Sequence, residues 1–454
     1  MRYGRSRIRL LLVVLCLAQS ARAQIEKQAE TYDLTLEDCL ATTLTQNPEI
    51  QQLRKDVERA AGTRLIYRSH ALPQLAGQTD DGLRGGRLYP PSGPYSIVTA
   101  EFSQPLLHPG IPPTLRRGRL EVVLAQQSLN RAITDRLHEA RLIFLQAQYF
   151  RDFVAVYEEL DQRLEANARS EQQRLDVGAG SEAALKSAKI QRLNLEVDLA
   201  NLRTYYFSSV SRIAQLCGRD PAQETNGSWQ LWLPKPIGPL QYEPASMDLA
   251  GESVYAREHR ADLKLLQALV DATAADKQTV RAQYLPAVSL VASGLFIPGN
   301  LLLSKQTSIV AGQDPRTSQV EAGVSMSWRV IDNGQVIGAS RQLAAIQQSY
   351  EIILRQLQQN IPRELATVAG SLQSADARRE AFLKSVESAE ENLRLVEAQV
   401  ALGEATQFDF LKAQTNLLAV RAGLLNAVWA HEAARAELDH VTGRYLQYDA
   451  DAAP

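Results

Sequence analysis

The sequence predicts a mainly α-helical protein, built from long helical hairpins, that also contributes four membrane-crossing β-strands per chain to a closed barrel. Three observations predict this class. The 454-residue chain begins with a segment typical of protein export. It then contains the same order of elements twice, and each copy combines a very long helical stretch with short segments in which apolar and polar residues alternate.

Residues 1–23 are predicted to be a secretory signal peptide. Four arginines within the first nine residues precede the apolar run 10–17, and Ala21-Arg22-Ala23 fits a small-x-small cleavage site. The run is far shorter than the roughly 20 residues that a spanning helix needs, which argues against a membrane anchor. Leu15 precedes Cys16 where a lipoprotein signal would have a small residue, so no lipid anchor is expected.

The rest of the composition excludes other classes. A formal net charge of −2 gives no electrostatic reason to expect nucleic acid as a partner. No later stretch approaches 18 consecutive apolar residues, which excludes an inner-membrane helical protein. Cys39 and Cys217 remain after the signal. Two buried unpaired thiols are expected, with one disulfide as the alternative.

The chain is a tandem duplication. Val57 pairs with Val270 at an offset of 213 (270−57), while Gly178 pairs with Gly403 at an offset of 225 (403−178). The expected organisation is a first repeat at 24–218, an irregular equatorial linker at 219–251, a second repeat at 252–445 and a C-terminal tail at 446–454.

Each repeat is expected to open with one helix, at residues 36–71 and 253–284, that ends at Leu-Pro because proline disfavours helix at the residue before it. Alternating segments follow at about 74–83 and 95–104 in the first repeat, and at about 287–296 and 319–328 in the second. Such alternation over about ten residues is typical of a membrane-crossing strand. A soluble surface hairpin is the alternative interpretation.

A very long helix comes next in each repeat. Residues 114–177 lack proline and contain only Gly118, so this stretch can form one helix of about 96 Å at 1.5 Å per residue. Its counterpart carries Pro362 and Gly370, where any bend is expected. A shorter helix then runs back, at 181–216 and 406–441, to a capping glycine.

The strand number predicts an oligomer. Open sheet edges are not tolerated in hydrocarbon, and known membrane barrels begin at about eight strands. Four strands per chain are therefore too few. A homotrimer would pool twelve strands and a matching ring of long helices.

Several segments, taken in order, resemble the TolC-like outer-membrane efflux family (outer-membrane factors). They are "LTLEDCLATTLTQNPEIQ", the two Leu-Pro helix ends, "FSQPLLHPG", "SWRVIDNGQ", and the turn motifs "VGAGS" and "LGEAT". The resemblance runs from about residue 34 to residue 445. It implies a trimeric, twelve-stranded barrel in the outer-membrane lipid of a Gram-negative bacterium, continued across the periplasm by an α-helical barrel.

The resemblance also implies a role as a duct. Such a duct passes small molecules or proteins from an inner-membrane transporter and a periplasmic adaptor (membrane fusion protein), in tripartite efflux or type I secretion. The alternative from another class is a secreted, soluble coiled-coil interaction or adaptor protein of the periplasm, which predicts neither membrane strands nor a fixed trimer.

The two motifs at the helix turns supply candidate binding residues. Gly178 and Gly403 suit turns that need positive φ, and Ser181 and Thr406 suit helix N-caps. The resemblance implies that an adaptor docks on these turns, at Val177, Gly178, Ser181, Leu402, Gly403 and Thr406.

Asp409 and Lys412 are candidates for the periplasmic aperture. They lie three residues apart and therefore on one helical face. An exposed ion pair is the simplest interpretation. The resemblance implies a charged ring at this level, in which Lys412 stands where a second acid is often found, so a mixed collar of aspartates and lysines is expected.

No enzyme is predicted. The six histidines include no HExxH pair or other spacing typical of a zinc site. No nucleophile pair or phosphate-binding glycine loop is present in the sequence. Neither a metal site nor a cofactor is expected.

Overall fold

The computed structural model describes residues 29–84, 93–178, 180–220, 222–225, 228–245, 247–297 and 317–446. The predicted signal peptide, and the tail beyond residue 446, lie outside the described residues. The chain divides into two compact units. The first unit contains the segment up to Gln52, Leu129–Ala261, and the chain from Gln358 onward. The second unit contains Leu53–Ser128 and Asp262–Leu357.

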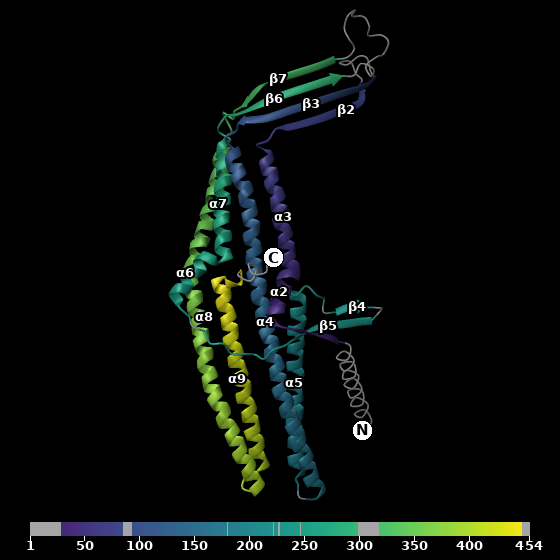
Figure 1. Cartoon of the computed structure of the whole chain (residues 1–454), viewed down its shortest axis with the longest axis vertical. Coiled ribbons are helices and arrows are strands. Elements are labelled where there is room, and N and C mark those ends of the chain that lie inside the picture. The colour runs from purple at the N-terminus through teal and green to yellow at the C-terminus, as the bar shows by residue number, and fades with distance from the viewer. Residues whose placement is uncertain are drawn as a thin grey trace, which may run out of the picture. The chain divides into compact units, whose positions relative to one another are not determined.

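The second unit carries a four-stranded antiparallel sheet (Figure 1). Its strands, in the order β2-β3-β6-β7, are β2 (Gln74–Arg84), β3 (Gly93–Leu107), β6 (Ala287–Ile297) and β7 (Thr317–Ser327). The β2–β3 and β6–β7 pairs are regular along their whole length, and the β3–β6 pair shifts register only between Pro105 and Leu107. All four predicted strands are therefore present, and they form one sheet.

Two helical hairpins follow the strands (Figure 1). Helix α4 (Ile111–Asp176) turns into α5 (Glu182–Leu216), and α8 (Gln335–Leu402) turns into α9 (Gln407–Thr442). The first unit contains α5, α9 and the parts of α4 and α8 that begin at Leu129 and Gln358. Leu160 and Leu164 of α4 pack with Leu195 of α5 and Leu411 of α9, so the two hairpins share a core. Pro362 lies inside α8, which continues through it.

The helix predicted at the start of each repeat is broken, and the expectation of one continuous helix was wrong. α2 (Leu36–Gln46) is separated from α3 (Pro48–Ser69) by Asn47, and α6 (Leu249–His259) is separated from α7 (Ala261–Ala282) by Arg260. Both separating residues have ψ of 125°, which is an extended value that ends a helix. Pro48 then occupies the first position of α3, where its missing N–H is not needed.

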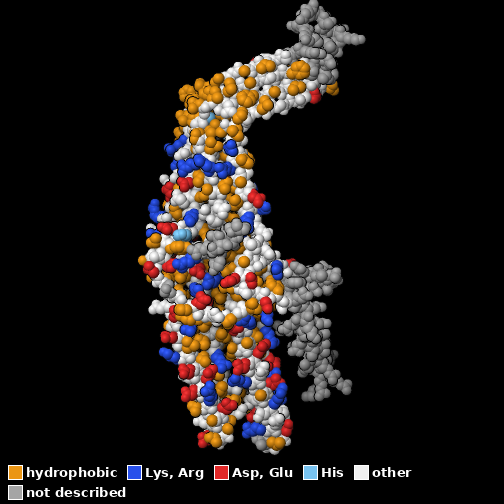
Figure 2. All heavy atoms as spheres, viewed as in Figure 1, with side chains coloured by type: hydrophobic (Ala, Val, Ile, Leu, Met, Phe, Trp, Pro, Cys, Tyr) orange, Lys and Arg blue, Asp and Glu red, His pale blue; other side chains and the backbone are white. Residues whose placement is uncertain are grey.

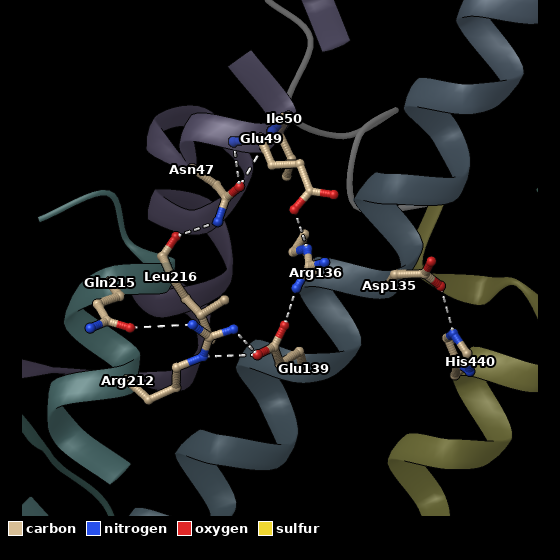
Figure 3. A network of polar contacts seen from close by, with 10 residues as sticks. All are labelled: Asn47, Glu49, Ile50, Asp135, Arg136, Glu139, Arg212, Gln215, Leu216 and His440. Carbon is tan, nitrogen blue, oxygen red and sulfur yellow. Dashed lines mark hydrogen bonds and ion pairs between the residues drawn. The ribbon is translucent and has the colours of Figure 1, made fainter. Parts of the chain in front are cut away.

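Asn47 fixes the first of these breaks (Figure 3). Its Oδ1 accepts hydrogen bonds from the backbone N–H of Glu49 at 3.1 Å and of Ile50 at 3.3 Å, and its Nδ2 donates to the carbonyl of Leu216 at 3.0 Å. The Asn47 side chain is 4% exposed. One buried amide therefore caps α3 and ties it to the end of α5.

The linker is more ordered than predicted. Its residues form β4 (Ala222–Thr225) and β5 (Ser228–Pro236), and β1 (Ala29–Leu34) pairs with β5 in parallel to complete a small sheet of order β1-β5-β4. Arg151 of α4 donates hydrogen bonds to the carbonyls of Pro236 and Gly238 at 2.7 and 2.8 Å. These bonds hold the end of the linker sheet against α4.

The cysteine expectation is confirmed, because Cys39 and Cys217 are both buried and free. The predicted capping glycines are also in place. Gly218 and Gly443 follow α5 and α9 with φ of +70° and +81°. Among the helices that the structure describes, none is long and apolar enough to cross a membrane.

Candidate functional site

One face of the four-stranded sheet is apolar. Residues directly opposite each other in an antiparallel pair lie on the same face, so the pairs Val288↔Met326 and Leu290↔Val324 place four apolar side chains together. The same register extends this face across β3 and β2. Its apolar members are Leu75, Val98, Phe102, Val288, Leu290, Phe296, Val320, Val324 and Met326.

The residues that the structure describes leave this apolar face uncovered. Val320, Val324 and Met326 are 81%, 66% and 67% exposed, and hydrophobic side chains are dense over the strands in Figure 2. Contiguous exposed apolar surface of this kind marks a binding or membrane surface in a native protein. The sheet therefore needs an apolar environment on this side.

The opposite face of the sheet is largely polar. The register places Glu101 beside Ser293 and Ser293 beside Glu321, so two carboxylates flank a hydroxyl across three strands. The pairs Gln78↔Thr99 and Ser289↔Ser325 continue the polar character. β2 departs from this division, because its register places Thr79 and Asp81 on the same face as Leu75. Alternation of apolar and polar faces along β6 and β7 is the pattern of a barrel with lipid outside and water inside.

Aromatic residues lie at one end of this sheet. Trp328 follows β7 directly, is 56% exposed, and donates a hydrogen bond from Nε1 to the carbonyl of Tyr284 at 3.0 Å. Tyr284 is itself 37% exposed. Aromatic residues with an apolar body and a polar tip are enriched at membrane–water boundaries.

The turns at the hairpin ends match the glycine predictions. Gly178 and Gly403 have φ of +75° and +77°, a conformation that glycine adopts at little cost. A Cβ added at either position would meet no atom of the described chain within 4 Å. Glycine is therefore required by the backbone and not by crowding.

The predicted N-caps are confirmed. The Ser181 side chain accepts a hydrogen bond from the N–H of Ala183, and Thr406 accepts one from the N–H of Asp409. The Asp409 side chain in turn accepts a hydrogen bond from the Thr406 N–H, and the two bonds together make a capping box at the start of α9. These helix-capping hydrogen bonds account for a hydroxyl residue at positions 181 and 406 without any partner protein.

The structure gives Asp409 a different contact from the one expected. Its Oδ2 accepts hydrogen bonds from the Thr406 hydroxyl and from the Thr406 N–H at 3.0 Å. These bonds lower the pKa of Asp409, and the charge of Lys412 adds a smaller effect in the same direction. No ion pair within 4.0 Å joins Asp409 to Lys412 in the described chain, although both side chains are exposed. The simple ion-pair interpretation is therefore wrong.

The residue before each turn glycine is apolar and exposed. Val177 precedes Gly178 and is 78% exposed, and Leu402 precedes Gly403 and is 75% exposed. The two turns lie at the same end of the first unit (Figure 1). Each hairpin thus presents an apolar side chain next to an open glycine backbone, which is a surface suited to contact with another protein.

A groove of about 640 Å³ lies near the turns, between α4, α8 and α9. At the end of the groove farther from the turns, Arg421 of α9 contacts Glu390 of α8 at 2.8 Å and Glu159 of α4 at 3.3 Å. Nearer the turns, Gln407 Nε2 donates a hydrogen bond to Asn167 Oδ1. These contacts join the second hairpin to the first.

Sequence reasoning missed these groove residues. Arg421 and Glu159 are 262 residues apart, and no local pattern indicates that two hairpins from different repeats lie side by side. The only available signal was the duplication itself, since equivalent hairpins with apolar stripes would be expected to pack together. It did not indicate which charged residues would meet.

The chain has clear similarities to known proteins. A family model described as "Outer membrane efflux protein" matches residues 254–444. The comparison with curated proteins found no match. Among solved structures, the outer membrane protein VceC of Vibrio cholerae has 17% identity to this chain. The match covers 90% of this chain and 96% of VceC, with a TM-score of 0.71.

Two further structures are similar to the same extent. The CmeC outer membrane channel of Campylobacter jejuni has 14% identity, with 90% of this chain and 85% of its own covered and a TM-score of 0.69. CusC, whose structures are described in terms of folding and transmembrane channel formation, has 16% identity. The match covers 90% of this chain and 92% of CusC, with a TM-score of 0.72. At these identities the likeness establishes a shared fold.

Proposed function

We propose that this chain is the outer-membrane channel of a tripartite efflux or type I secretion system. The premise is that residues 254–444 match the outer membrane efflux protein model and that 90% of the chain shares the fold of solved outer-membrane channels. The channel passes small molecules or proteins across the periplasm and outer membrane of a Gram-negative bacterium. In this role it is a conduit and not an enzyme.

The amphipathic sheet is the observation that carries the proposal. Its order β2-β3-β6-β7 leaves β2 and β7 as the two edges of the four-stranded sheet, and unpaired strand edges in hydrocarbon are too costly to persist. Three chains related by a threefold axis pair β2 of one protomer with β7 of the next. The product is a closed twelve-stranded barrel with its apolar face toward lipid and its polar face toward water.

The strand lengths fit this role. Strands of 11, 15, 11 and 11 residues meet the 9–11 residues that a tilted membrane strand requires. A soluble coiled-coil adaptor, the competing function, gives no reason for an uncovered apolar face on a sheet. This face therefore favours the channel.

The hairpin turns are the proposed contact with the periplasmic adaptor. Val177, Gly178 and Ser181 form one contact set, and Leu402, Gly403 and Thr406 form its counterpart. The exposed Val177 and Leu402 side chains support this role, because apolar residues beside an open backbone suit the packing of a partner helix. The adaptor then connects the channel to the inner-membrane transporter.

Asp409 and Lys412 are proposed to line the periplasmic aperture. Three protomers bring three copies of each charge to one level of the channel. Because Asp409 is held by the capping box and Lys412 has no ion pair to it within the chain, Lys412 is available to a carboxylate of the neighbouring protomer. This interprotomer arrangement replaces the ion pair expected along one helix.

Two adjacent substitutions in β7 test the channel. Val324→Lys places a charge on the apolar face, at a cost of about 2–4 kcal/mol near the bilayer midplane, and should prevent outer-membrane assembly. Ser325→Lys places the same charge on the polar face and should assemble normally. The readouts are outer-membrane fractionation and planar-bilayer conductance. Equal behaviour of the two variants, or recovery of the parent protein without detergent, would support the soluble alternative.

A further inference from the structure

Two histidines and two carboxylates from distant parts of the chain meet between α4 and α9. His138 and Asp135 come from α4, and Glu437 and His440 come from α9. We call these four residues the α4–α9 histidine cluster. The rings of His138 and His440 stack with their centroids 4.3 Å apart. The proposed channel function assigns no role to this cluster.

The Glu437 carboxylate faces both rings. One of its oxygens lies 3.0 Å from Nε2 of His138, and the other lies 4.0 Å from Nδ1 of His440. One ligand atom from each of these three residues falls within 4.8 Å of the other two. In a tetrahedral zinc site with bonds of about 2.0–2.1 Å, ligand atoms lie about 3.3 Å apart. An imidazole binds a metal in the plane of its ring, and the two rings stack with an interplanar angle of 19°. The His138 ring would therefore have to turn out of the stack for the three ligands to meet at one ion.

Asp135 supplies the outer support that such a site needs. Its Oδ1 lies 3.1 Å from Nε2 of His440, and Figure 3 draws this contact. A histidine that binds a metal through one ring nitrogen usually gives the N–H of the other nitrogen to a carboxylate or carbonyl. If His440 binds through Nδ1, its Nε2–H donates to Asp135 in the geometry already present.

The chemistry of the donors selects the class of cation. Imidazole nitrogens with one carboxylate suit Zn²⁺, Cu²⁺, Ni²⁺ and Co²⁺, whereas Mg²⁺ and Ca²⁺ prefer oxygen ligands. The Glu437 carboxylate offsets part of the charge of a divalent ion, while Asp135 also lies 3.8 Å from Arg131. His138 is 12% exposed and Glu437 is 45% exposed, so the site is anchored on one side and open to an entering ion and a water ligand on the other.

We propose that His138, Glu437 and His440 bind a divalent cation of the zinc class, with water as a fourth ligand and Asp135 as a positioning residue for His440. Bound metal would staple the end of α9 to α4. The sequence-based expectation of no metal site depended on local spacing, and it did not consider ligands 302 residues apart (440−138). The proposal does not depend on the channel function.

The test uses the full chain in detergent, purified without a histidine tag and stripped with a chelator. Zn²⁺ is titrated by calorimetry, and Co²⁺ is used as a spectroscopic probe. The expected result is one ion per chain with micromolar or tighter affinity and visible absorption bands typical of four-coordinate Co²⁺. His138→Ala and His440→Ala should each abolish this binding. Asp135→Asn should weaken it about 10- to 100-fold.

Controls separate binding from folding. His70→Ala removes an exposed histidine outside the cluster and should bind like the parent. Glu437→Gln keeps the side-chain size and should lose the ion while the oligomer, measured by native mass, stays intact. Millimolar binding only, or unchanged stoichiometry in His440→Ala and Glu437→Gln, would overturn the proposal and leave the cluster as a hydrogen-bonded contact between two helices.

Discussion

The carboxylate of Asp409 accepts a hydrogen bond from the backbone N–H of Thr406 at 3.0 Å and a second from the Thr406 hydroxyl. The residue that the sequence marks as an aperture charge therefore also caps the start of α9. Its orientation is fixed by the turn and not by Lys412. Changes at Asp409 consequently alter both the local fold and the charge, whereas changes at Lys412 alter the charge alone.

The capping box predicts a pH-dependent stability at the start of α9. The folded-state pKa of Asp409 is lowered from 3.8. The stabilisation from its charge is therefore fully present at pH values well above 3.8 and is lost as the pH falls through the lowered folded-state pKa. Asp409→Ala should speed hydrogen exchange in residues 404–412 at pH 7. As the pH falls through the folded-state pKa, the difference in exchange between the variant and the parent should shrink, after correction for intrinsic rates.

Thr406→Val is the matched variant for this test, because it removes the hydroxyl partner and leaves the carboxylate. It should also speed exchange at pH 7, and by less than Asp409→Ala if the backbone N–H bond persists. Exchange in Asp409→Ala that equals the parent at pH 7 would show that the box does not stabilise the turn.

Lys412 should control the aperture through charge. Lys412→Asp places six carboxylates from three protomers around one opening, where like charges repel. Single-channel conductance should rise and selectivity should shift toward cations. The difference should shrink in 1 M salt, where screening acts within about 3 Å.

Lys412→Gln separates loss of the cation from gain of an anion, and should give an intermediate conductance. If Lys412→Asp and Lys412→Gln both conduct like the parent in planar bilayers at low salt, the narrowest point lies at another level of the channel.

The turn glycines should be needed for docking more than for assembly. A side chain at Gly178 or Gly403 would point into open space in the single chain, so the double change Gly178→Trp and Gly403→Trp adds bulk at the turns without a clash in the described fold. Export and adaptor crosslinking should be lost, while trimers still reach the outer membrane.

The double Gly178→Ala and Gly403→Ala variant is the control, since it carries the same cost of positive φ, of order 1 kcal/mol per turn, with almost no added bulk. It should retain most export. Equal loss in the Trp and Ala variants would indicate that backbone geometry, and not a docking surface, is what the glycines provide.

Arg421 should hold the two hairpins together near the turns. It is 32% exposed and contacts Glu390 and Glu159, so each pair contributes at most about 1 kcal/mol after solvent screening. Arg421→Ala should increase hydrogen exchange or protease cleavage in the α8–α9 turn region by severalfold. Arg169→Ala, whose partner Glu165 lies on the same helix, should leave it unchanged.

The regular elements followed from the sequence because they depend on local chemistry. Proline-free stretches predicted α4, the Leu-Pro pairs marked the ends of the helices before β2 and β6, and alternation predicted the strands. The break at Asn47 was missed because residues 36–71 were predicted as one helix, although Pro48 lies inside this range and is the first residue of a new helix. The side-chain contacts that cap this break come from distant Leu216 as well as from local residues.

The candidate site was predictable only in part. The turn residues lie in contiguous motifs, so their backbone roles could be assigned. Arg421 with Glu159, and His138 with His440, meet only through the packing of one repeat on the other, and a single sequence does not contain that register. For the same reason the small sheet was missed, because β1 pairs in parallel with a strand about 200 residues away.

The central claim is that three chains close one barrel, and cryo-electron microscopy of the detergent-extracted protein tests it most directly. The account predicts a particle of three chains with twelve strands, in which β2 of each protomer pairs with β7 of its neighbour and Val320, Val324 and Met326 face the detergent belt. A monomeric particle, or a trimer in which the four-stranded sheets stay separate, would contradict it.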